Sequence, residues 1–194
     1  MLVRANFFEE PLEKESSGDL KLFAFDKGGI AMGGTFDHLH NGHKLLLSQA
    51  MLCSNSRILC GVTTDALLKK KVYAQYLESF EARRQSVIDF CTKLNPRITS
   101  MPEGKGLVTF ELDDPIGPTG TDSELEALVL TREVAKGGVM INEARERNSL
   151  HPLRLVFVDM ILSEVTEDDN SFSNKTSSTY IREYIAKQAD KHSE

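Results

Sequence analysis

The residues most capable of chemistry lie in a short stretch at residues 33–43, with the sequence Gly-Gly-Thr-Phe-Asp-His-Leu-His-Asn-Gly-His. The stretch follows an apolar run at residues 30–32 and leads into a segment whose apolar residues recur at helical spacing. Asn41 stands where the N-cap of that helix is expected. A helix N-terminus offers unpaired N–H groups and a partial positive charge, which together hold anionic oxygens. Histidines at such an end indicate phosphate chemistry.

Two of these histidines, His40 and His43, bracket the expected helix start, with Gly42 allowing a phosphate to approach the backbone closely. Imidazoles placed there can donate hydrogen bonds to oxygens on which charge develops during phosphoryl or nucleotidyl transfer. We expect His43 to be the transition-state stabiliser and His40 to contact nucleotide phosphates. The alternatives are a capping role for His43 and a loop-orienting role for His40, and His38 is expected to be a loop residue.

Three segments resemble a known family. Residues 34–43 resemble the T/HxGH signature of the nucleotidyltransferase superfamily. Residues 175–182, Lys-Thr-Ser-Ser-Thr-Tyr-Ile-Arg, are similar to the S-S-T-x-I-R segment of the same superfamily. Residues 114–122, Asp-Pro-Ile-Gly-Pro-Thr-Gly-Thr-Asp, resemble the eukaryotic and archaeal type of phosphopantetheine adenylyltransferase, and the likeness runs from about residue 29 to residue 187. Because the sequence contains no P-loop motif, we expect the monofunctional type rather than a fusion to a P-loop kinase.

The resemblance implies a reaction in which the phosphate of 4′-phosphopantetheine attacks the α-phosphorus of ATP, giving dephospho-coenzyme A and pyrophosphate. It implies that Thr35 lies between acceptor and α-phosphate, and that Lys71, or less favoured Lys70, grips the acceptor phosphate and assists catalysis with His40 and His43. The residues implied to bind ATP are Gly34, Thr35, Phe36, His40, His43, Gly117, Thr119, Asp122, Ser177, Ser178, Thr179 and Arg182. Mg²⁺ is expected to be carried mainly by the triphosphate, with no protein residues forming a metal cage.

Each of these assignments has a plainer structural alternative. Three lysines in a row, residues 69–71, are most often a solvated charge run. Residues 117–119 can form an ordinary turn. Serine and threonine at residues 177–179 can simply cap the helix that follows. Arg83 and Arg84 are expected on a helix surface.

The composition is that of a soluble globular protein of 194 residues, with 40% hydrophobic and 27% charged residues. We expect a partly ordered N-terminal extension at residues 1–27 and one nucleotidyltransferase domain at residues 28–190.

The formal charge of −6 argues against a nucleic-acid partner. No apolar run is long enough for a membrane helix or a signal peptide, so we expect a cytoplasmic protein. Cys53, Cys60 and Cys91 are expected to be reduced core residues. No feature of the sequence sets an oligomeric state.

Alternating strand and helix patterns predict an α/β fold with a Rossmann-like open parallel sheet and helices on both faces. Strands are expected at residues 29–32, 57–62, 108–112, 127–130 and 153–159, and helices at residues 43–53, 80–94, 136–148 and 178–188. Ligands in such sheets bind beyond the carboxyl ends of the strands, where we expect His40, Thr119 and Ser178 to converge.

Two rival functions remain. Another nucleotidyltransferase of the superfamily, such as a cytidylyltransferase or a mononucleotide adenylyltransferase, would share the histidine motif but use a different nucleotide or acceptor. A non-catalytic nucleotide-binding regulator would keep the fold and bind without turnover. The presence of both signatures favours an enzyme.

Overall fold

The computed structural model describes residues 25, 28–54, 56–159 and 177–191. Five parallel strands form one sheet in the order β3-β2-β1-β4-β5. The strands are β1 (Gly29–Gly34), β2 (Arg57–Thr63), β3 (Gly106–Leu112), β4 (Leu125–Thr131) and β5 (Arg154–Val158). The α-helices are α1 (Asn41–Cys53), α2 (Asp65–Leu68), α3 (Phe80–Leu94), α4 (Ala135–Arg147) and α5 (Ser178–Lys191). Three short 3₁₀ helices join them: η1 (Ala74–Tyr76), η2 (Gly117–Gly120) and η3 (Arg132–Val134). The predicted α/β fold is confirmed.

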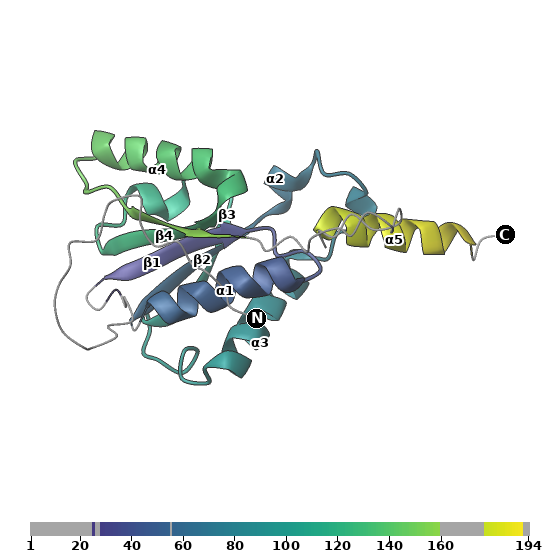
Figure 1. Cartoon of the computed structure of the whole chain (residues 1–194), viewed down its shortest axis with the longest axis horizontal. Helices are drawn as coiled ribbons and strands as arrows, with labels where there is room; N and C mark the ends of the chain where they lie inside the picture. Colours follow the sequence, from purple (N-terminus) through teal and green to yellow (C-terminus); the bar gives the residue numbers. More distant parts are fainter. Residues whose placement is uncertain (1–24, 26–27, 55, 160–176, 192–194) are drawn as a thin grey trace, which may run out of the picture.

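Helices cover both faces of the sheet, with α1 and α3 on one side and α4 on the other (Figure 1). The strands alternate between two cores because successive side chains point to opposite faces. Ile30 and Met32 pack with α1 and α3, whereas Ala31 packs with α4. The near-continuous apolar strands are what a parallel sheet buried on both faces requires.

Most predicted elements match the structure within a few residues. The range predicted for α3 matches the observed helix, and Ser79 caps it by accepting a hydrogen bond from the Ala82 amide at 3.2 Å. Strand β1 runs to Gly34, two residues further than predicted, because Gly33 and Gly34 still pair with β2. Cys53, Cys60 and Cys91 are free and buried, as predicted.

The expected N-terminal extension lies almost entirely outside the described residues. Its one described residue, Phe25, donates its amide to the Cys53 carbonyl at 2.6 Å and forms an isolated bridge with Ser54. Among the described residues, no helix has the length and apolar character needed to cross a membrane.

A glycine starts strand β3 for a steric reason. Gly106 has φ 66°, and a Cβ there would lie 2.0 Å from the Ile98 carbonyl oxygen. A side chain at this position would combine a left-handed backbone with a collision against rigid backbone. The turn into β3 therefore depends on glycine.

Candidate active site

The two histidines meet at the start of helix α1. His40 is the N-cap, and its Nδ1 accepts a hydrogen bond from the Gly42 amide at 3.1 Å. Asn41, predicted to be the cap, is instead the first residue of the helix. An imidazole nitrogen can replace the usual cap oxygen because its lone pair accepts the same orphan N–H. The His40 and His43 rings stack with centroids 3.9 Å apart and an interplanar angle of 24°.

His43 is held in an environment that keeps its ring neutral. The ring also packs against the buried Phe36 ring, with centroids 5.4 Å apart. Burial lowers the pKa of His43 from 6.5 to about 4, with smaller contributions from His40 and Lys71 and opposition from Asp37. Its Nδ1 atom is buried and has no hydrogen-bond partner within the described part of the chain. At neutral pH the ring therefore offers one N–H as a donor without carrying a charge.

These rings face a cleft of about 330 Å³. The cleft lies between the carboxyl ends of β1 and β4. The strand order reverses between these two strands, and ligands in open α/β sheets usually bind at such a point. Its lining residues are Gly33, Gly34, Thr35, Phe36, His40, Gly42, His43, Leu46, Lys71, Leu130, Thr131, Glu133, Val134, Ser177, Ser178, Thr179 and Arg182. The two sequence signatures, more than 130 residues apart, thus border one cleft.

The hydroxyl groups at the start of α5 already have protein partners, which decides what each can still do. Ser177 Oγ accepts the Tyr180 amide at 3.3 Å, so it caps the helix and keeps its own hydrogen to donate. Thr179 Oγ1 accepts from Arg182 at 3.2 Å and likewise keeps a hydrogen. Ser178 Oγ donates to the Asp37 carbonyl at 2.8 Å, so its oxygen can only accept while that bond lasts. Two of the three hydroxyls can therefore donate to a phosphate.

Arg182 is a buried residue whose charge is neutralised inside the protein. Its side chain forms an ion pair with the carboxylate of Asp37, and both side chains are almost fully buried, 1% and 0% exposed. Its Nε donates to the Val72 carbonyl at 3.1 Å. The resemblance assigned Arg182 to ATP; the structure places it at the cleft but engages its guanidinium with three protein groups.

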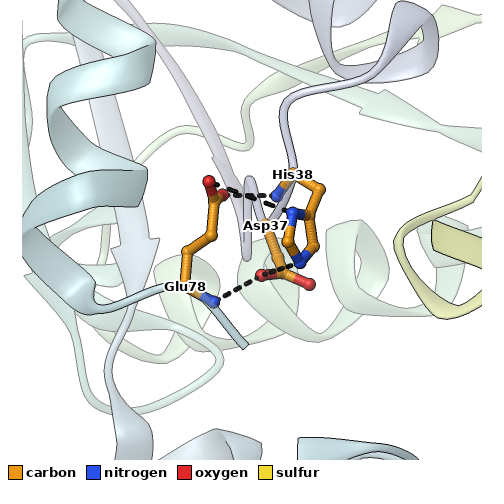
Figure 2. A group of neighbouring side chains, drawn as sticks. All are labelled: Asp37, His38 and Glu78. Atoms are coloured by element: carbon orange, nitrogen blue, oxygen red, sulfur yellow. Dashed lines mark hydrogen bonds and ion pairs between the residues drawn. The ribbon is translucent and has the colours of Figure 1, made fainter. Parts of the chain in front are cut away.

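The turn that carries Asp37 is unusual in its backbone. Phe36 and His38, on either side of Asp37, have φ of 53° and 45°, in the left-handed region that non-glycine residues rarely adopt. The His38 amide donates to Glu78 Oε2 at 2.6 Å, and the Glu78 amide donates to Asp37 Oδ1 at 2.9 Å (Figure 2). The ring of His38 bonds the Tyr76 carbonyl at 2.9 Å, in keeping with the predicted loop role. These bonds fasten the turn to residues 76–78.

Asp37, His38 and Glu78 also lie close enough for one ion to reach all three, since their ligand atoms fall within 4.8 Å of one another. The Asp37 carboxylate, however, already bonds the Glu78 amide and the Arg182 guanidinium. The cluster is therefore built to position the turn.

Arg83 was expected on a helix surface and is instead fully buried, at 0% exposure. Its Nη1 donates to the carbonyls of Thr35, at 2.9 Å, and Thr63, at 2.8 Å, and its Nε donates to the Glu78 carbonyl at 3.1 Å. Desolvation lowers the pKa of this guanidinium. The residue joins the ends of β1 and β2 beneath the cleft. Its spacing of four residues before the buried Val87 was the signal in the sequence that places it on the buried face.

Among the three consecutive lysines, Lys71 lines the cleft, whereas Lys69 and Lys70 do not. Lys71 is also close enough to lower the pKa of His43. This is the arrangement expected for the lysine favoured from the sequence, although binding of an acceptor phosphate stays a prediction.

Three predicted ATP ligands do not reach the cleft. Asp122 forms a 2.7 Å ion pair with Arg57, the first residue of β2, so it lies at the amino end of the parallel sheet. The carbonyls of Thr119 and Asp122 accept from the buried Arg145 of α4 at 2.7 and 2.8 Å. Gly117 lies beside the side chains of Phe110 and Leu112 and is not among the residues that line the cleft. The expected convergence of Thr119 with His40 and Ser178 is therefore wrong, because the chain turns back toward the start of β4 before residue 119.

Several lining residues were not among the predicted site residues. Leu130, Thr131, Glu133 and Val134 border the cleft from the carboxyl end of β4 and the turn after it. Their position follows from the pairing of β4 with β1, which places the end of β4 beside the histidine motif. Strand order, once known, would have identified them.

Comparison with known proteins shows the family to which the chain belongs. A family model described as cytidylyltransferase-like matches residues 31–184. A phosphopantetheine adenylyltransferase of Saccharomyces cerevisiae is 35% identical over 159 residues, covering 82% of this chain and 49% of that protein. Another of Pyrococcus horikoshii is 34% identical over 136 residues, covering 70% of this chain and 80% of that protein. The solved structure of an Archaeoglobus fulgidus protein of unknown function is similar with a TM-score of 0.58 and 26% identity, covering 71% of this chain and 94% of that chain.

The chain spans about half the length of the first curated relatives it matches, 49% in both. The match of the family model nevertheless begins within β1, continues through the other four described strands and includes both signatures. The chain belongs to the cytidylyltransferase-like family of nucleotidyltransferases.

Proposed function

We propose that this protein transfers the adenylyl group of ATP to 4′-phosphopantetheine, giving dephospho-coenzyme A and pyrophosphate. The observation that carries the proposal is the stacked pair of His40 and His43 at the N-terminus of α1, facing a cleft that the start of α5 also borders. Relatives named phosphopantetheine adenylyltransferase, from yeast and archaea, support the choice of substrates.

In this proposal the α-phosphorus of ATP lies between Thr35 and His43. The acceptor phosphate attacks in line, so that one P–O bond forms as the bond to pyrophosphate breaks, and no covalent intermediate with the protein is needed. His43 donates its N–H to an oxygen that gains charge in the transition state, and Lys71 holds the acceptor phosphate. The N-termini of α1 and α5 supply partial positive charge for the remaining oxygens.

In this proposal Mg²⁺ accompanies the triphosphate in the cleft. Glu133 provides the one carboxylate among the described lining residues. Magnesium usually takes few protein carboxylates and several phosphate or water oxygens. When bound it would offset charge on the phosphates, while the protein groups named above orient them.

A cytoplasmic location is part of the same proposal. The three cysteines are free and buried, which suits a reducing compartment.

The test is release of pyrophosphate with ATP or CTP, each offered with 4′-phosphopantetheine and with other phosphorylated acceptors. We expect turnover with ATP and 4′-phosphopantetheine, and His43→Ala to lower kcat by about 10²- to 10³-fold with ATP affinity nearly unchanged. His151→Ala, at an exposed position outside the cleft, is the matched control. Turnover with CTP alone would identify a cytidylyltransferase, and calorimetric binding of ATP without any turnover would identify a regulator.

A further inference from the structure

The segment that presents Lys71 to the cleft has few contacts of its own. It leaves α2 after the buried Leu68, and residues 69–72 are all exposed, with Val72 60% exposed. Tyr73, which follows, has φ of 57° in the left-handed region. With no core side chain between Leu68 and Tyr73, the position of Lys71 depends on backbone hydrogen bonds.

Two such bonds bracket the lysine. The Lys71 amide donates to the Leu68 carbonyl at 2.9 Å, and the Val72 carbonyl accepts from Arg182 Nε at 3.1 Å. The first is local to its own turn, whereas the second reaches across 110 residues to α5. Of these two bonds, the arginine bond is therefore the one that connects this turn to another element beside the cleft.

Arg182 is well suited to hold a neighbour in place. Its guanidinium is 1% exposed, is neutralised by the fully buried Asp37 and bonds Thr179 within its own helix. Asp37 is in turn fixed by the Glu78 amide at 2.9 Å and lies in the turn that begins the histidine motif. One chain of contacts thus runs from the histidine motif through the buried Asp37 and Arg182 to Val72, the exposed residue after Lys71.

We infer that Arg182 is a positioning residue that acts through Lys71, holding this lysine over the cleft by its bond to the Val72 carbonyl. Its charge is balanced by Asp37, so the triphosphate is left to the helix ends and hydroxyls of the cleft. The inference rests on the proposed function, because it concerns the grip on the acceptor phosphate.

A double-mutant cycle separates action through Lys71 from direct contact with ATP. Arg182→Lys keeps a cation beside Asp37 but removes the Nε donor to Val72. We expect this change to lower kcat/KM for 4′-phosphopantetheine by about 10- to 100-fold, with the KM for ATP altered less than about twofold. In a Lys71→Ala background the same change should lower kcat/KM by less than about threefold, because the group through which it acts is gone.

Arg145→Lys is the matched control. Arg145 is also 1% exposed and bonds backbone carbonyls, but those lie at the amino end of the sheet. Arg145→Lys should change kcat/KM by the same factor in the wild type and in the Lys71→Ala background. If Arg182→Lys lowers kcat/KM by the same factor in the Lys71→Ala background as in the wild type, the inference is overturned. It is also overturned if Arg182→Lys raises the KM for ATP more than the KM for 4′-phosphopantetheine.

A second readout does not depend on turnover. Hydrogen exchange of the Lys71 amide should accelerate at least about tenfold in Arg182→Lys and stay unchanged in Arg145→Lys. If Arg182→Lys does not fold, Asp37→Asn/Arg182→Gln, which removes both buried charges together, takes its place in both measurements. Absence of turnover in the wild type would defeat the proposed function alone, whereas unchanged exchange at Lys71 would defeat the positioning role.

Discussion

The neutral state of His43 leads to a specific dependence of stability on pH. Its pKa is lowered from 6.5 to about 4 in the folded protein, chiefly by burial. Below pH 6.5 the His43 ring therefore binds a proton in the unfolded chain but not in the folded chain, and this lowers the free energy of the unfolded state. The contribution of His43 to folding is complete above pH 6.5 and is lost as the pH falls toward 4. The lowered pKa thus predicts destabilisation by acid.

The size of this effect follows from the two pKa values. The full shift corresponds to about 3 kcal/mol, at about 1.4 kcal/mol for each pKa unit. Between pH 7 and pH 5 only part of the shift is expressed, which gives about 2 kcal/mol. Because the ring borders an open cleft and is not fully buried, we expect about 1–2 kcal/mol of that difference to be measured.

The assay is urea unfolding at pH 5 and pH 7 for the wild type and for His43→Gln. The other titratable groups contribute equally to both proteins. Between pH 7 and pH 5 the free energy of unfolding of the variant should therefore fall by about 1–2 kcal/mol less than that of the wild type. Lys44→Gln is the control, because it places the same side chain on the exposed side of the same helix without removing a histidine. Equal losses in wild type and His43→Gln, or an NMR titration of the His43 ring with a midpoint near 6.5, would refute the assignment.

Four further predictions concern the acceptor site and the backbone. Lys71→Ala should raise the KM for 4′-phosphopantetheine by about 10- to 100-fold through loss of a charged contact, whereas Lys70→Ala should change this KM less than about twofold. Equal effects of the two substitutions would indicate that the lysines are only a solvated charge run. Thr35→Val should weaken calorimetric binding of 4′-phosphopantetheine by about tenfold, and unchanged binding would leave Thr35 a turn residue. Gly106→Ala should cost about 2–4 kcal/mol of unfolding free energy because of the positive φ and the backbone collision described above. Gly137→Ala, with nothing within 4 Å of the added methyl group in helix α4, should instead add about 0.5–1 kcal/mol, as judged by the same urea titrations.

Local patterns were sufficient for most secondary structure. Helix α3 was predicted with its observed bounds because Ser79 supplies a cap and apolar residues recur at helical spacing. The five strands were predicted because buried parallel strands are short apolar runs rich in β-branched residues. Both features act over a few residues, so they can be read without knowledge of the fold.

The misplaced residues depend on contacts between distant segments. Arg83 was expected at the surface because charged side chains are seldom buried unless paired, and its partners, three backbone carbonyls and the carboxylate of Asp65, lie outside its own helix. Thr119 and Asp122 follow β3 in sequence, which suggested the carboxyl end of the sheet. Only the path of the chain back toward Arg57 and Arg145 moves them to the other end.

The sequence by itself determined the kinds of groups at the site: histidines at a helix start, hydroxyls before a second helix, and a lysine after the second strand. The tertiary structure decided how they are used. It made His43 neutral by burying it, paired Arg182 with Asp37 across 145 residues, and placed Lys71, of the three consecutive lysines, at the cleft. Burial and charge pairing depend on which strands lie side by side, and that order, β1 between β2 and β4, arises only when the whole sheet assembles.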